Sequence, residues 1–345
     1  MSFKAFGKNP SGKELVKVQQ SPNYREGIFH NEHSTLIMDE KLSMLKASWM
    51  FLNKPKNTVP PVALPVVRTD LHQLPGNSPV IVWFGHSSYL IHVGGKNVLV
   101  DPVFSGHASP FSFFAKSFPG TNVFTAADMP VIDLLIITHD HYDHLDYETV
   151  LQLKNRVKHI ATSLGVQSHL LYWGFDPAAI TELDWWQQEN LPGGFTLTAA
   201  PARHFSGRSL DRFKTLWASY ILEVDGYRFY IGADSGYDTH FKMIGDQYGP
   251  FDIALLETGQ YNEAWRHIHM MPEEAVQAGI ELKAKVMMPV HWGKFSLALH
   301  PWDEPIKRVV KKAGELGIKI TTPKIGQPVV LHEGYPTEHW WEKLS

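Results

Sequence analysis

The sequence predicts an α/β protein in which two mixed β-sheets pack together and helices cover their outer faces. Short β-rich runs begin at Pro79, an almost continuous apolar run covers residues 131–138, and helical segments alternate with strands through the second half. A strand that is apolar on both sides is typical of a sheet buried on both faces, and the recurring order of strand and helix favours sheets covered by helices. The 345 residues, 43% of them hydrophobic, suffice for one large domain.

The individual elements follow from hydrophobic periodicity. The expected strands are 80–84, 89–93, 97–100, 131–138, 195–200, 217–224, 228–231, 252–256 and 286–290, and the expected helices are 147–155, 164–173, 272–282 and 304–316. Gly94 and Gly95 between the second and third strands indicate a tight hairpin.

The first 75 residues differ from the rest and are interpreted as an N-terminal arm that packs on a main domain of residues 76–345. The arm carries more basic than acidic residues, whereas the main domain has the opposite balance. An apolar helical stripe in the arm precedes a proline-rich linker and consists of Leu42, Leu45, Trp49 and Leu52. Packing against the main domain is the simpler interpretation of the stripe, and contact with an anionic lipid surface is the alternative.

Composition excludes several classes of protein and site. The chain has no cysteine, so disulfides, thiolate metal sites and a cysteine nucleophile are excluded. A net charge of −3 gives no basic excess, and we expect no nucleic-acid partner. The N-terminal residues do not resemble a signal peptide, and no apolar run approaches the ~20 residues of a membrane span. We therefore expect a cytoplasmic protein, with peripheral contact to a membrane as the alternative.

The motif that carries the chemistry lies directly after the apolar run 131–138. Residues 139–144 read HDHYDH and place three imidazoles and a carboxylate within six positions. Side chains two apart in an extended turn can meet at one centre, and the next two ligands can meet at a neighbouring centre. Sets of three protein ligands leave a coordination position open for water, as a catalytic zinc site requires.

Further ligands follow other strands. His204, Asp234 and His291 each come just after the carboxyl end of an expected strand, which is the edge of an α/β sheet where ligands gather. Together with residues 139–144 they complete two sets of three with one carboxylate between them. Because the set is rich in imidazole, two zinc ions are favoured, and iron or manganese suits the same ligands.

These motifs resemble the metallo-β-lactamase superfamily. From about residue 75 to the end, further segments resemble its N-acyl-phosphatidylethanolamine-hydrolysing phospholipase D branch. In chain order these segments are GHSS at 85–88, DPVFS at 101–105, HLDY at 144–147, ELDWW at 182–186, YGPFD at 248–252, His269 with PEEA at 272–275, and HWG at 291–293. The resemblance implies an αββα sandwich with two mixed sheets. Residues 257–261 are more polar than in the animal members, which leaves the acyl and headgroup preference open.

The resemblance also implies roles for individual residues. One metal would be bound by His139, His141 and His204, the other by Asp143, His144 and His291, and Asp234 would bridge the two. Asp101 would support the histidine loop from behind, and His86 would do the same or contribute to the pocket. Asp143 and His269 are the expected catalytic residues, with His269 reaching the substrate phosphate. The expected substrate contacts are Tyr261, Gln260, Trp292 and Trp186.

The implied reaction is hydrolysis of a phosphodiester by a metal-bridging hydroxide. The branch cleaves N-acyl-phosphatidylethanolamine to an N-acylethanolamine and phosphatidic acid. The alternative is a lactonase or a phosphodiesterase that acts on a soluble small molecule with the same dinuclear site. An aromatic segment at 111–118, with four phenylalanines and Lys116, is either a loop that dips into a membrane surface or a buried plug. Whether the chain forms a homodimer stays open.

Overall fold

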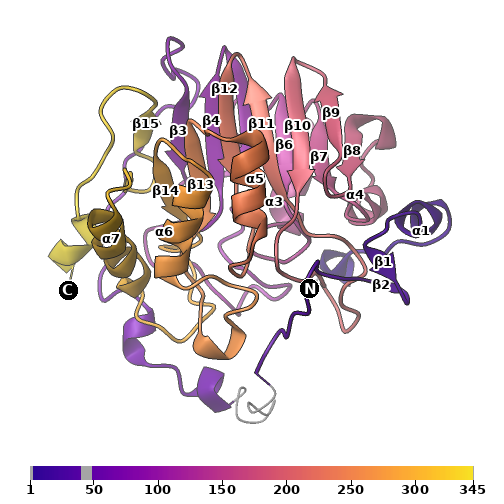
Figure 1. The fold of residues 1–345 in the computed structure, drawn as a ribbon, viewed down its shortest axis with the longest axis horizontal. Coiled ribbons are helices and arrows are strands. Elements are labelled where there is room, and N and C mark those ends of the chain that lie inside the picture. Colours follow the sequence, from indigo (N-terminus) through magenta and orange to yellow (C-terminus); the bar gives the residue numbers. More distant parts are fainter. Residues whose placement is uncertain (1–2, 40–48, 345) are drawn as a thin grey trace.

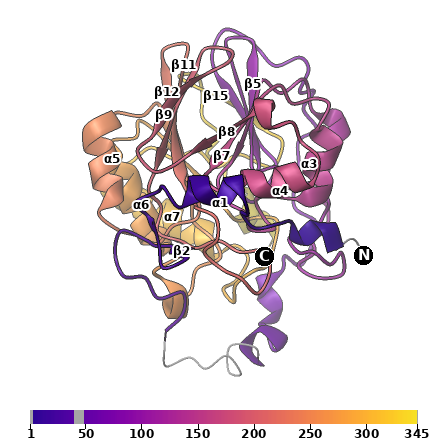
Figure 2. The ribbon, with the colours of Figure 1, turned by 90° about the vertical axis from the view of Figure 1, so that its right-hand side faces the viewer.

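Two β-sheets lie face to face at the centre of the protein, and helices cover the outer face of each (Figures 1 and 2). The computed structural model describes residues 3–39 and 49–344. In Figure 2, one side of the sheets carries α5 (His240–Tyr248), α6 (Pro272–Glu281) and α7 (Glu304–Leu316), and the other carries α3 (Tyr147–Leu153) and α4 (Gln167–Tyr172). This αββα arrangement confirms the expected fold class.

The larger sheet has seven strands, and its strands β3 and β6 consist entirely of apolar residues. In spatial order they are β15 (Pro328–Val330), β3 (Val80–Trp83), β4 (Tyr89–Val93), β5 (Lys96–Val100), β6 (Leu134–Ile137), β7 (Ile160–Ser163) and β8 (Ile180–Leu183). The pairs from β5 to β8 are parallel and the others antiparallel. Every residue of β6 is buried, as a central parallel strand covered on both faces requires.

The second sheet has six strands. In spatial order they are β14 (Met287–Val290), β13 (Ile253–Glu257), β12 (Tyr227–Ile231), β11 (Ser219–Val224), β10 (Phe195–Ala200) and β9 (Gln188–Leu191). The pairs β12–β13 and β13–β14 are parallel, and β10 and β12 both run antiparallel to β11. The strands β10, β12, β13 and β14 therefore run in one direction and end at one edge of the sheet.

The remaining elements are short. In chain order they are η1 (Phe3–Phe6), α1 (Lys13–Val18), β1 (Tyr24–Arg25), β2 (Ile28–Phe29), η2 (Lys56–Thr58), η3 (Ala126–Asp128), η4 (Pro177–Ala179), η5 (Glu263–Trp265) and η6 (Trp340–Leu344), where η marks a 3₁₀ helix. Figure 1 shows the indigo N-terminal elements lying against the main body beside α4.

Two apolar cores hold the layers together. The larger core includes Leu90, Ile136 and Leu222, and the other joins the outer face of the six-stranded sheet to α5–α7 through Phe241 and Val276. The main core does not need a metal for its burial.

Each expected strand and helix is present, but some boundaries differ. The strand expected at 131–138 is only Leu134–Ile137, because Val131 is 55% exposed and precedes the buried stretch. The helix expected at 164–173 begins at Gln167, after a turn. The strands β7, β8, β9 and β15 were not expected, since runs of three or four residues carry too little periodicity and β9 is mostly exposed. The nine-residue helix α5 and the short arm elements α1, β1 and β2 were not expected either.

The apolar stripe expected in the arm is only partly described. Leu42 and Leu45 lie outside the described residues, while Trp49 and Leu52 are 65% and 84% exposed. In the part of the chain that the structure describes, no helix is long and apolar enough to cross a membrane.

Candidate metal centre

The histidine loop of residues 139–144 connects the end of β6 to α3. Asp146 caps α3, and its side chain accepts a hydrogen bond from the backbone N–H of Glu148. The loop is thus fixed between a buried strand and a capped helix, and its side chains project at the sheet edge where β10, β12 and β14 also end.

The first cluster brings together His139, His141, His204 and Asp234, whose potential ligand atoms all lie within 4.8 Å of one another. Nδ1 of His141 lies 3.0 Å from Nε2 of His139 and 3.1 Å from Nε2 of His204. Oδ2 of Asp234 lies 3.9 Å and 3.7 Å from the same two Nε2 atoms. Three imidazoles therefore converge, which is the set of protein ligands found in one class of catalytic zinc site, and a carboxylate lies beside them.

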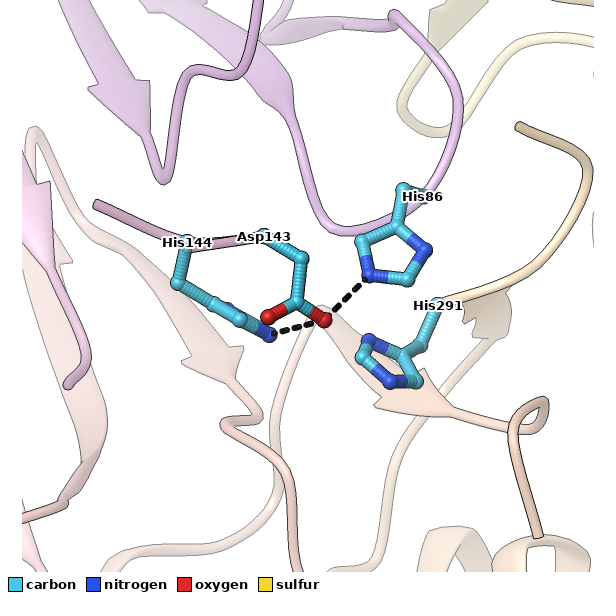
Figure 3. Close-up of side chains that lie close together, drawn as sticks. All are labelled: His86, Asp143, His144 and His291. Atoms are coloured by element: carbon cyan, nitrogen blue, oxygen red, sulfur yellow. Dashed lines mark hydrogen bonds and ion pairs between the residues drawn. The ribbon is translucent and has the colours of Figure 1, made fainter. Parts of the chain in front are cut away.

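The second cluster contains His86, Asp143, His144 and His291 (Figure 3). Oδ2 of Asp143 lies 3.7 Å from Nε2 of His144 and 2.9 Å from Nε2 of His86. Asp234 also reaches this cluster, because its two carboxylate oxygens lie 3.2 Å from Nε2 of His144 and 3.1 Å from Nδ1 of His291. Asp234 is thus placed between the clusters, where a bridging ligand must be.

Several buried polar atoms of the centre have no hydrogen-bond partner among the described residues. They include Nε2 of His291 and Oδ1 of Asp234. A buried acceptor without a partner costs roughly 1–3 kcal/mol, and a cation between these atoms would remove that cost. Donor type, convergence and unmatched acceptors together fit a dinuclear site.

The protonation of the ligands also suits cations. Burial lowers the pKa of His139, His204 and His291 well below the usual value, and it lowers the pKa of His141 to about 4. These rings are neutral near pH 7, and each can offer a lone pair. Burial opposes the charge of Asp143, but His144 and His86 hold the pKa of this carboxyl well below its usual range.

His144 is the exception. Burial disfavours its charged form, but the carboxylates of Asp234, Asp143 and Asp101 outweigh burial and raise the pKa of His144 well above 6.5. A cation must therefore displace a proton from this ring. Below the raised pKa we expect the affinity for zinc to weaken about tenfold for each unit by which the pH falls. Competition with a coloured chelator over a pH series measures this slope.

Asp101→Asn supplies a control for this pH dependence. The variant loses one of the three carboxylates that raise the pKa of His144, so the weakening should begin at a lower pH than in the unmodified protein. An affinity that stays constant with pH in both proteins would contradict a protonated His144.

Hydrogen bonds from neighbouring side chains fix the orientation of the ligand histidines. Asp101 lies 2.7 Å from Nδ1 of His144 and accepts hydrogen bonds from the backbone N–H and the hydroxyl of Thr138 at 2.9 and 2.7 Å. The Ser87 hydroxyl lies 2.9 Å from Nδ1 of His291. Such partners set the tautomer and the direction of a ligating ring. The backbone is strained here, because His86, Asp101, Gln260 and His291 have positive φ of 54°, 39°, 61° and 66°.

A buried network joins the histidine loop to the N-terminal arm. The carboxylate of Asp140 accepts bonds from Gly207 N–H at 2.7 Å and from the Thr215 hydroxyl at 3.0 Å, and it lies 3.2 Å from Nε2 of His169. The guanidinium of Arg208 donates to the backbone carbonyls of Asp140 and of Ala5 in the arm, both at 2.7 Å. The arm therefore supports the loop that carries the ligands. No sequence pattern indicated these partners.

His269 lies beside both clusters. Its ring centroid is 5.0 Å from that of His204 and 5.4 Å from that of His291. Its Nδ1 lies 2.7 Å from Oε2 of Glu257, a buried carboxylate that sequence analysis did not assign. Burial lowers the pKa of His269 and raises that of Glu257 well above the usual value.

A cavity of about 290 Å³ opens above the clusters. Its lining comprises Ile37, Met38, Phe51, His141, Asp143, His204, Phe205, Arg212, Asp234, Gln260, Trp265, Ile268, His269, His291 and Leu297. The arm supplies part of the apolar wall, because Phe51 stacks on Trp265 with ring centroids 5.9 Å apart. Arg212 is the one lysine or arginine of the described lining, and its guanidinium lies 5.5 Å from the centroid of the Phe205 ring.

Of the four expected substrate contacts, only Gln260 lines this cavity, and the other three lie elsewhere. The Tyr261 hydroxyl donates to Glu304 at 2.7 Å, away from the ligands. Trp292 is buried and stacks against Trp83, with ring centroids 5.4 Å apart. Trp186 lies in the turn between β8 and β9 and is 37% exposed. These three residues are close in sequence to ligands but do not line the cavity, because neighbouring side chains point in different directions.

Comparison with known proteins agrees with this geometry. Residues 96–292 match the family model described as a beta-lactamase superfamily domain. The chain belongs to the beta-lactamase superfamily. Membership of this superfamily and the two ligand clusters place the chain among the metal-dependent hydrolases.

Individual relatives of the superfamily differ in how much of the chain they match. An uncharacterized protein of Mycobacterium tuberculosis is 37% identical over 328 residues, which are 94% of this chain and 88% of that protein. The N-acyl-phosphatidylethanolamine-hydrolyzing phospholipase D 1 of Caenorhabditis elegans is 32% identical over 227 residues, 62% of this chain and 64% of that enzyme.

The fold also has solved neighbours. Igni18, a metallo hydrolase of Ignicoccus hospitalis, superimposes with a TM-score of 0.58 at 22% identity and covers 75% of this chain and 100% of its own. At this identity the structural similarity is evidence for the fold alone.

Proposed function

We propose that this chain hydrolyses the phosphodiester of N-acyl-phosphatidylethanolamine to an N-acylethanolamine and phosphatidic acid. The observation that carries the proposal is the pair of ligand clusters sharing Asp234 at the floor of a cavity with apolar walls. The similarity to the Caenorhabditis elegans phospholipase supports the same substrate. His269 beside the clusters supports chemistry at a phosphate, which needs a donor for the developing negative charge.

Two zinc ions suit the site best, because five of its seven proposed ligands are imidazoles. His139, His141 and His204 would hold one ion, Asp143, His144 and His291 the other, with Asp234 between them. When bound, such a pair supplies a water of lowered pKa and neutralises charge on the phosphate oxygens.

The side chains around the ligands have separate tasks. The carboxylate of Asp143, held by His86 at 2.9 Å, is placed to orient the attacking water. His269 donates a hydrogen bond to a phosphate oxygen or a proton to the leaving alkoxide. Phe51, Trp265 and Leu297 keep bulk water from the reacting atoms and offer an apolar surface to an acyl chain.

The test is digestion of a total lipid extract by the zinc-loaded protein, with the products identified by mass. We expect N-acylethanolamines and phosphatidic acid to appear together, and a chelator to prevent both. If no lipid is consumed while a soluble phosphodiester is cleaved, the lipid substrate is wrong and the phosphodiesterase activity stands.

One observation favours a second candidate, a lactonase or phosphodiesterase that acts on a soluble small molecule. The cavity of about 290 Å³ is at the small end of the range for ligand pockets, and Arg212 in its lining suits a compact anion. The same assay distinguishes this candidate, since it predicts turnover of small substrates without any lipid product.

Access to a phospholipid calls for contact with a membrane surface, which we propose is made by Phe113 and Phe114. Their side chains are 61% and 65% exposed. Only the middle of the aromatic segment 111–118 is exposed, because Phe118 is buried and Phe111 packs on Phe6 with ring centroids 6.1 Å apart. The two anchored ends hold the two exposed rings in place.

Replacing Phe113 and Phe114 by serine should slow hydrolysis of vesicle lipid by about tenfold and leave a short soluble phosphodiester unaffected. Inserting two rings at a membrane surface contributes a few kcal/mol at most, at ~25 cal/mol per Å². Met243→Ser on α5, which also removes an exposed apolar side chain, is the control. Equal rates for variant and unmodified protein on vesicles would exclude this loop as the contact.

A further inference from the structure

Glu257 is a buried carboxylate at the end of β13 to which no role has yet been given. Its Oε1 accepts hydrogen bonds from the backbone N–H groups of Ser235 at 2.7 Å and Met270 at 3.2 Å. Its Oε2 lies 2.7 Å from Nδ1 of His269. No lysine or arginine pairs with it among the residues that the structure describes. The oxygen of a neutral side-chain amide could accept the same two backbone hydrogen bonds. These bonds therefore do not explain why a carboxylate, whose burial costs desolvation energy, stands at this position.

The surroundings of Glu257 connect two parts of the site. Ser235 directly follows the bridging carboxylate of Asp234, and Met270 directly follows His269. Ile268, which precedes His269, is fixed as well, because its backbone carbonyl lies 2.9 Å from Nδ1 of His204. Both neighbours of His269 are therefore tied to the metal site, and only its ring remains to be oriented.

We propose that Glu257 is the positioning residue of His269: it accepts the Nδ1–H of the ring and so presents Nε2 to the substrate cavity. The inference deepens the proposed function, on which it rests, because it explains how His269 is aimed at a phosphate. In its ionised form, which two cations at the neighbouring clusters would favour, Glu257 can only accept, so it selects the tautomer that carries hydrogen on Nδ1. The carboxylate behind the histidine of serine proteases sets the tautomer in the same way.

Glu257→Gln separates positioning from a merely structural role. The amide oxygen can still accept from Ser235 and Met270, so the backbone bonds are kept. The amide NH₂ then faces Nδ1 of His269, and this bond can form only if Nδ1 accepts and the hydrogen moves to Nε2. The variant thus reverses one hydrogen bond at almost unchanged shape. We expect kcat to fall on the order of 100-fold, with little change in KM or zinc content.

The chain offers a matched control at Glu182 on β8. One oxygen of this buried carboxylate accepts from the backbone N–H groups of Gly165 at 2.7 Å and Gln167 at 3.0 Å, and the other pairs with Lys17 at 3.0 Å. None of these partners belongs to the ligand clusters. Glu182→Gln should leave kcat unchanged, so a loss in Glu257→Gln cannot be ascribed to removal of a buried charge in general.

Two measurements decide the inference. The ¹⁵N chemical shifts of the His269 ring report its tautomer without reference to activity, and they should show hydrogen on Nδ1 in the unmodified protein and on Nε2 in Glu257→Gln. In a double-mutant cycle on a soluble phosphodiester, Glu257→Gln should cause no further loss in a His269→Ala background. The role of Glu257 would be overturned if the losses of activity from the two substitutions multiplied in the double variant. It would also be overturned if the His269 tautomer were the same in Glu257→Gln as in the unmodified protein.

The same experiments keep this inference distinct from the proposed function. If the protein cleaves no phosphodiester, the proposed function fails, and the ¹⁵N shifts alone still decide whether Glu257 sets the tautomer of His269. If it cleaves phosphodiesters and the two losses multiply, the function stands and the positioning role is refuted.

Discussion

Asp234→Asn should lower hydrolysis by about a thousandfold or more and should reduce bound zinc from two equivalents to one or none. The carboxylate has one oxygen near His144 and the other near His291, at 3.2 and 3.1 Å, and it lies within 4 Å of His139 and His204. An amide is uncharged and offers only one oxygen, so it cannot serve both clusters. Loss of several kcal/mol of charge stabilisation corresponds to this factor. His141→Ala should have a similar effect.

Metal analysis and circular dichroism distinguish this result from misfolding. The variant should keep the secondary structure of the unmodified protein, because the main apolar core is closed without the metal. Asp238→Asn, four residues along the same loop and paired with Arg203 and His33, should keep both metals and full activity. If metal-free protein hydrolysed the substrate at full rate, the metal-dependent mechanism would be wrong.

His269→Ala should lower kcat by about 10²- to 10⁴-fold, as removal of a positioned acid–base group does. The zinc content should not change, because the seven proposed ligands remain in place. Because His269 also lines the cavity, some loosening of substrate binding should appear in KM. Steady-state kinetics with metal analysis on the same samples measures all three quantities.

His267 is the natural control, since it is an exposed histidine two residues earlier in the same loop. His267→Ala should leave kcat and zinc content unchanged. If His269→Ala instead lost zinc together with activity, His269 would be a ligand, and the assignment of the second cluster would have to be revised.

The sequence was informative where local order determines position. His204, Asp234 and His291 follow strands that run in one direction, so they meet at one sheet edge, and the pattern of strands alone is enough to expect this. It was uninformative about partners distant in the chain. Neither the pairing of His269 with Glu257 nor the contact of Arg208 with Ala5 leaves a local pattern. Trp292 and Tyr261, which do not line the cavity, show the same limit, because side-chain direction depends on packing.

The left-handed backbone at the site has a consequence for the evolution of the protein. His86, Asp101, Gln260 and His291 each hold a conformation that costs a residue with a side chain roughly 1–2 kcal/mol and costs glycine almost nothing. Glycine at any of them would relax the chain and remove a side chain that the site uses. Selection for heat tolerance and selection for activity thus oppose each other at these four positions. A heat-adapted relative should retain the strain there and acquire its added stability in the layers of the sandwich.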